Sequence, residues 1–109
     1  MINGCEVRVA FSGDTKRALD LAADELEQLG YGRKKLADDK LEMFFKGKWI
    51  TSDPSKMRHF VWVRAEGGQL VFAFGTGIVA SHWTENDREW AQARADAIVS
   101  AIRAQLASG

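Results

Sequence analysis

The sequence predicts one compact α+β domain over residues 1–109, a two-layer sandwich in the order β-α-β-β-β-β-α. Its sheet is expected to be mostly antiparallel and curved, with two helices packed on one face. Three observations predict this fold: alternating apolar runs around a glycine pair in 59–75, a periodic helix after the first strand, and a long helical segment at the end. A hydrophobic content of 46% and a charged content of 28% are typical of a globular protein.

The segment 59–75, HFVWVRAEGGQLVFAFG, is the clearest hairpin. Gly67-Gly68 can adopt the positive φ angles of a two-residue turn. Because directly opposed residues share a face of the sheet, one face is predicted to be core and carries Val61, Val63, Ala65, Leu70, Phe72 and Phe74. The other face carries Phe60, Trp62, Arg64, Val71 and Ala73. That mixture is neither a clean core nor an ordinary solvent surface.

The segment before this hairpin predicts one strand and one helix. Residues 6–11 alternate between apolar and polar, which is typical of a half-buried strand. Ser12 or Asp14 can cap a helix over 15–29, and Gly30 follows as its terminator. The buried stripe of this helix is predicted to contain Leu19, Ala22, Leu26 and Leu29.

A second hairpin is predicted over 33–36 and 40–46, with Asp38-Asp39 in its turn. Gly47 is expected to mark a bulge, after which 48–50 continue the strand. Residues 51–56 form the clearest loop. The second strand of the central hairpin can continue past Gly75 through residues 78–80, with a bend at the glycines.

Thr84 is predicted to cap a last helix that runs from residue 85 to about residue 107. Acidic residues in its first turn suit the helix dipole. Its buried stripe is expected to hold Trp90, Ala93, Ala97 and Ala101 beside Ile98, Ile102 and Leu106. A helix with so many small residues can approach a sheet closely, and it is long enough to lie across several strands.

The second face of the hairpin is the candidate binding surface. We expect Phe60, Trp62 and Arg64 to lie together there, joined from neighbouring strands by Phe44, Lys46, Lys48 and Trp49. Aromatic and basic side chains on an uncovered sheet suit a protein interface or a homodimer, and that is the predicted function. The alternative is a small apolar ligand in a pocket between the curved sheet and the C-terminal helix. This face has two further interpretations. Its aromatic rings can stack on the bases of single-stranded nucleic acid. Alternatively, the curved sheet or the 51–58 loop covers it, and it is a minor second core.

The charge distribution argues against the hypothesis that the chain binds nucleic acid. The formal net charge is zero. Residues 31–64 hold nine lysines and arginines against four acidic residues, and the rest of the chain has the opposite excess. No basic, glycine-rich or aromatic nucleic-acid signature accompanies this asymmetry, so nucleic acid is an unfavoured partner.

Binding is favoured over catalysis, and no catalytic residue, metal ligand or cofactor is predicted. His59, His82 and Cys5 are the only histidines and cysteine, too few for an evident metal or nucleophile constellation. Gly75-Thr76-Gly77 stands too far before the last helix to cradle a phosphate. No apolar run suggests a membrane span, and a cytoplasmic location is expected. A trimmed lipoprotein anchored at Cys5 is the alternative.

Overall fold

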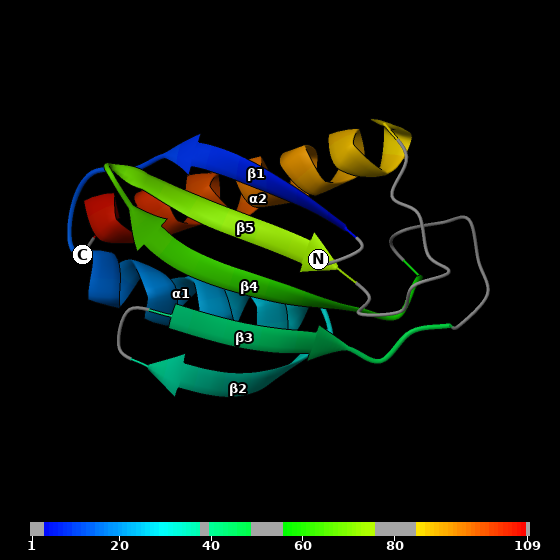
Figure 1. The fold of residues 1–109 in the computed structure, drawn as a ribbon. Helices are drawn as coiled ribbons and strands as arrows, with labels where there is room; N and C mark the ends of the chain where they lie inside the picture. The colour runs from blue at the N-terminus through cyan, green and yellow to red at the C-terminus, as the bar shows by residue number, and fades with distance from the viewer. Residues whose placement is uncertain (1–3, 38–39, 49–55, 76–84, 109) are drawn as a thin grey trace.

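The computed structural model is a two-layer sandwich of one five-stranded sheet and two helices, which confirms the predicted fold class and element order (Figure 1). The structure describes residues 4–37, 40–48, 56–75 and 85–108, and the side chains of these residues except at 4, 33–37 and 108. The elements are β1 (Gly4–Ala10), α1 (Thr15–Gln28), β2 (Tyr31–Ala37), β3 (Lys40–Phe45), β4 (His59–Glu66), β5 (Gln69–Gly75) and α2 (Glu85–Ser108).

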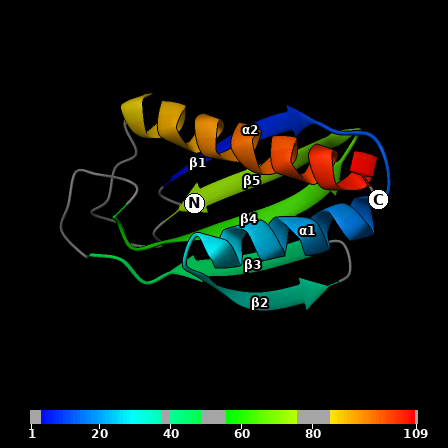
Figure 2. The same cartoon turned by 180° about the vertical axis from the view of Figure 1, so that it is seen from behind.

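The sheet is antiparallel throughout, in the strand order β1-β5-β4-β3-β2. Strands that follow one another in the chain pair directly from β2 to β5, and β1 joins the far edge beside β5. Both helices lie across the same face of the sheet (Figure 2). The opposite face carries no helix from the described part of the chain.

The β4–β5 hairpin has the predicted turn and the predicted register. Gly67 and Gly68 have φ angles of 55° and 78°, the left-handed region in which a glycine has no steric penalty. Glu66 pairs with Gln69, and the pairing continues without a shift along both strands to Phe60 and Gly75. The face predicted as core faces the helices, and its buried members are Val61, Val63, Leu70, Phe72 and Phe74, with Ala65 half-buried.

Helix α1 begins at the predicted cap. The Asp14 Oδ1 atom accepts a hydrogen bond from the backbone N–H of Arg17 at 3.2 Å, and Gly30 follows the helix with a φ angle of 97°. Leu19 and Leu26 are buried, as predicted. Leu29, in contrast, is 45% exposed, which corrects its assignment to the buried stripe. It is the C-cap residue, so it lies where the helix ends rather than on the continuous stripe.

Helix α2 occupies the predicted range, and its predicted buried stripe is right in part: Ile98 and Ile102 are buried, and Trp90 and Leu106 are half-buried against the core. Ala91, Ala95 and Val99 are fully buried, whereas Ala93 and Ala97 are exposed. Alanines stand on both faces of this helix and have little hydrophobic contrast, so they do not determine which face turns inward. Within the described ranges, neither helix has the length and apolar character needed to cross a bilayer.

Helix α2 also closes one edge of the sheet. Three of its side chains donate hydrogen bonds to backbone carbonyls of β1: Arg88 to Glu6 at 3.3 Å, Gln92 to Arg8 at 3.4 Å, and Arg103 to Ala10. Unpaired carbonyls of an edge strand are otherwise available to a strand from another chain. These contacts make β1 a poor template for strand addition.

Gly47 permits a close approach of two backbone segments just after β3. A Cβ atom at this position would overlap the backbone carbonyl of Lys56. Directly beyond it, Lys48 forms an isolated parallel bridge with Met57. The expected bulge in a continuing strand is therefore replaced by the end of β3 at Phe45 and a tight backbone contact.

Several predicted features lie outside the described residues. They are the turn at Asp38-Asp39, the continuation at Trp49-Ile50, the loop over 51–55, the strand continuation over 78–80 and the cap at Thr84.

The inward face of β4 can be tested with Val63→Asp. Val63 is 1% exposed on a central strand, so this change buries a carboxylate among apolar side chains. We expect the free energy of unfolding to fall by about 3–5 kcal/mol, measured by urea denaturation followed by circular dichroism. Lys40→Asp places the same charge at an exposed strand position and should change stability by less than about 0.5 kcal/mol. Equal stability of the two variants would refute the face assignment.

Candidate binding surface

Three aromatic side chains form a continuous row on the outer face of the sheet, and we call Phe44, Phe60 and Trp62 the aromatic ladder. Phe44 pairs directly with Phe60 across β3 and β4, and their ring centroids are 4.7 Å apart. Phe60 and Trp62 stack along β4 with centroids 5.5 Å apart and planes 20° from parallel. Each ring is half-buried, so each still presents part of its surface outward. The predicted clustering of these three residues is therefore observed.

Polar contacts hold both ends of the aromatic ladder. At one end, the Trp62 Nε1–H group donates a hydrogen bond to Glu42 Oε1 at 3.1 Å. At the other end, the Arg58 guanidinium lies over the Phe44 ring, 4.8 Å from its centroid. A cation over an aromatic face is attracted by the ring quadrupole. Ring stacking and these end contacts together restrict the rotamers of the ladder before any partner binds.

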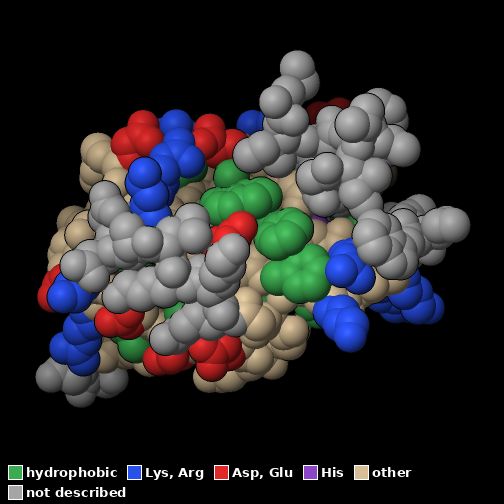
Figure 3. Space-filling view, turned by 60° about the horizontal axis from the view of Figure 1, so that its bottom comes forward, with side chains coloured by type: hydrophobic (Ala, Val, Ile, Leu, Met, Phe, Trp, Pro, Cys, Tyr) green, Lys and Arg blue, Asp and Glu red, His purple; other side chains and the backbone are tan. Residues whose placement is uncertain are grey.

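The strands beside the ladder leave its central row open. Gly32 pairs with Phe44 on one side, and Gly75 pairs with Phe60 on the other. Neither glycine has a side chain that could stand between the rings and a partner. Figure 3 shows the hydrophobic side chains as a patch on this face, with lysine and arginine side chains on one flank and an acidic side chain against the other.

The remainder of the outer face is an ion-pair network. Arg64 contacts Glu66 at 2.8 Å and Glu6 at 2.6 Å, and Arg8 reaches the same two carboxylates at 3.6 Å. Hydrogen bonds to these acids raise the pKa of Arg64 above its usual value, and Arg64 in turn lowers the pKa of Glu66. Val71, which lies between the two arginines in the sheet, is fully buried. Arg64 is thus already paired with acids of its own chain.

The other predicted surface residues are placed as follows. Lys46 follows β3 and is exposed. Lys48 is also exposed and belongs to the bridge with Met57. Trp49 lies outside the described residues, so its expected contribution stays a prediction. The structure therefore brings together the aromatic half of the predicted set, while its basic half consists of one ion-paired arginine and two exposed lysines.

The inner face of β4 carries a polar pair that the sequence analysis missed. His59 is 1% exposed and Tyr31 is 4% exposed, and the Tyr31 hydroxyl is hydrogen-bonded to His59 Nε2. The His59 Nδ1 atom lies 2.6 Å from the Met57 carbonyl, which can only accept, so Nδ1 carries the proton. Nε2 is then the acceptor of the Tyr31 hydroxyl proton. The pair is a hydrogen-bonded neutral network.

Aromatic rings enclose this pair. The centroids of Phe45, Phe74 and Trp90 lie 5.4, 5.9 and 5.6 Å from that of His59. Burial lowers the pKa of His59 to about 4 and raises the pKa of Tyr31. The strand alternation that placed Val61 and Val63 inward extends to His59, so the hairpin pattern could have identified it. Its partner, 28 residues earlier in the chain, could not be found without the fold.

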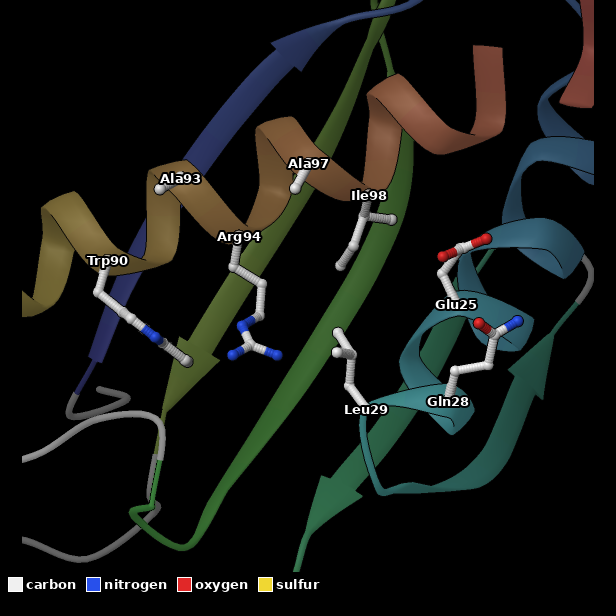
Figure 4. Close-up of a pocket in the computed structure, with 8 residues that line it drawn as sticks. All are labelled: Glu25, Gln28, Leu29, Trp90, Ala93, Arg94, Ala97 and Ile98. Atoms are coloured by element: carbon white, nitrogen blue, oxygen red, sulfur yellow. The ribbon is translucent and has the colours of Figure 1, made fainter. Parts of the chain in front are cut away.

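A cavity of about 420 Å³ lies between α1 and α2 (Figure 4). Its lining residues are Glu25, Gln28, Leu29, Trp90, Ala93, Arg94, Ala97 and Ile98. The predicted alternative site was a pocket between the sheet and the C-terminal helix. That pocket stays a prediction; on the inward side of the helix, Ala91, Ala95 and Val99 are fully buried. In Figure 2 the two helices diverge toward the end of the molecule at which α1 stops and α2 begins.

Comparisons with known proteins add no assignment to these features. The chain matches no protein-family model, and no curated protein is significantly similar to it in sequence. Among the described residues, no group of three or more histidine, cysteine, aspartate or glutamate side chains could hold a metal ion.

The buried state of His59 predicts a pH dependence of stability. The unfolded chain protonates this imidazole near pH 6.5, whereas the folded chain resists protonation down to about pH 4. Between these values the unfolded state binds more protons, so the free energy of unfolding should fall as the pH is lowered, by up to about 3 kcal/mol for this group.

Urea denaturation at a series of pH values between 7 and 4 measures this contribution. Carboxylates also titrate in this range, so the relevant quantity is the difference between wild type and His59→Phe. We expect His59→Phe to be less stable at pH 7, because the Tyr31 hydroxyl loses its acceptor, but to have a shallower pH dependence. Replacing the second histidine, in His82→Gln, is the matched control. Identical pH profiles for wild type and His59→Phe would refute the assignment.

Proposed function

We propose that this chain is a small binding domain that associates with a protein partner, foremost a second copy of itself, through the aromatic ladder. The observation that supports the proposal is the row of three half-buried rings, each in contact with the next, on the face opposite the helices. Aromatic side chains supply most of the binding energy in many protein interfaces, because they remove a large apolar area from water with few rotatable bonds.

The fixed geometry of the ladder favours association. A partner that immobilises free side chains loses about 0.5–1.5 kcal/mol for each one. Here Phe60 is already in ring contact with both Phe44 and Trp62, and Trp62 is already hydrogen-bonded to Glu42. Little further ordering is required, so more of the free energy gained by burying the rings is retained as affinity.

The charges around the ladder favour a second copy as the partner. Arg58 lies at the Phe44 end, and exposed Lys46 follows β3 directly. Glu42 lies at the Trp62 end. Two copies can face each other with a two-fold axis that passes between their Phe60 rings. The basic end of one ladder then lies against the acidic end of the other, which is the self-complementarity that an isologous dimer requires. A cytoplasmic location, in keeping with the single cysteine, belongs to the same proposal.

Analytical ultracentrifugation over a concentration series tests the proposal. Wild type is expected to form a dimer, and Trp62→Ala should weaken dimerisation by about tenfold or more because it removes one anchor of the ladder. Lys46→Glu should also weaken it without altering the core, since Lys46 is exposed. Higher salt should weaken the wild-type dimer through screening of the charged ends.

Leu29→Ala is the matched control. It removes an exposed apolar side chain from the helix layer and should leave dimerisation unchanged. A wild-type protein that remains monomeric at the highest concentration rules out self-association. If Trp62→Ala mainly lowers the melting temperature while wild type is monomeric, the ladder is a covered second core and the proposed function is wrong.

A further inference from the structure

The cavity between α1 and α2 has an unusual cation in its wall. Arg94 is half-buried, and its guanidinium lies over the Trp90 ring with 4.8 Å to the centroid. None of the described residues accepts a hydrogen bond from Arg94 or places a carboxylate within ion-pair distance of it. The N–H groups of a guanidinium lie in its plane, so a guanidinium placed over an aromatic ring can still bind a planar anion with two hydrogen bonds.

The rest of the cavity is mostly apolar and has room for a ligand. Leu29 and Ile98 lie between the two walls in Figure 4, and Leu29 is the large hydrophobic residue left exposed in the described chain. On α2, Ala93 and Ala97 are one helical turn apart and exposed, so their small side chains leave the cavity open. A volume of about 420 Å³ lies within the range of small-molecule sites.

The charge on the opposite wall limits the kind of anion that fits. Glu25 of α1 faces the cavity across from Arg94 (Figure 4) and accepts a hydrogen bond from Gln105 at 2.8 Å. A ligand with one acidic group can direct it to Arg94 and away from Glu25. A second acidic group at the other end would lie near the Glu25 carboxylate and be repelled.

We propose that this cavity binds a small amphipathic monocarboxylate, with its carboxylate on the edge of the Arg94 guanidinium and its apolar body against Leu29 and Ile98. The Trp90 ring holds the guanidinium in place, so the cation is oriented before the ligand arrives. The site lies on the helix side of the molecule, opposite the aromatic ladder, and the inference is independent of the proposed self-association.

A titration followed by ¹H–¹⁵N NMR with 4-phenylbutyrate as the probe tests the site. We expect saturable shifts confined to the backbone around Leu29, Arg94 and Ala97 and to the Trp90 indole N–H. The uncharged 4-phenylbutanamide should bind about tenfold more weakly, because it cannot form a charge-assisted pair with Arg94. Phenylsuccinate, which carries two carboxylates, should also bind more weakly than 4-phenylbutyrate.

Variants of α2 give matched controls. Arg94→Gln should weaken 4-phenylbutyrate binding about tenfold and leave the amide unaffected. Ala97→Phe should abolish binding by filling the cavity, whereas Ala104→Phe places the same ring at an exposed position outside it. Trp62→Ala should bind the probe as wild type does, which separates this site from the ladder.

Three results would overturn the inference. They are the absence of shifts at millimolar probe, equal affinities for the acid and the amide, and unchanged binding by Ala97→Phe. Equal affinities would show a purely apolar cavity, and unchanged binding by Ala97→Phe would place the probe elsewhere. None of these outcomes bears on the oligomeric state, so the failure of this site and the failure of the proposed dimer can be told apart.

Discussion

The register of the β4–β5 hairpin is the constraint on which both layers of this molecule depend. Gly67-Gly68 sets the pairing, and a slip of one residue would turn every side chain of these two strands to the opposite face. In the observed register Phe72 and Phe74 face the helices, and the aromatic ladder faces outward. The turn therefore determines which aromatic residues build the core and which lie on the outer face.

The same strand positions both candidate sites. His59 faces inward, where its ring contacts Trp90, and Trp90 supports the guanidinium of Arg94 in the helix layer. The next residue, Phe60, faces outward and is the centre of the ladder. Because β4 is a central strand, its backbone is hydrogen-bonded to a neighbouring strand on each side. A rigid strand is a suitable base for both surfaces.

Much of the fold could be predicted from the sequence because its strongest signals are local. The hairpin register follows from two glycines and strict alternation, and the start of α1 follows from Asp14. The inward face of α2 could be predicted only in part: Ile98 and Ile102 indicate it, but alanines lie on all sides, and the choice between Ala93 and Ala95 depends on the sheet that the helix meets. The grouping of Phe44 with Phe60 was predictable because adjacent strands bring alternate residues together.

The parts of the candidate sites that escaped prediction depend on contacts between distant segments. Tyr31 of β2 meets His59 of β4 because each pairs with Phe45 of the strand between them. Leu29 lies across a cavity from Arg94 because α1 and α2 diverge over the sheet. The closed β1 edge has the same origin, since α2 side chains reach its carbonyls after the helix has docked. With that edge hydrogen-bonded to its own helix, association by strand addition is disfavoured at β1. This is in keeping with our proposal that a partner binds the outer face of the sheet, where the rings are already in contact.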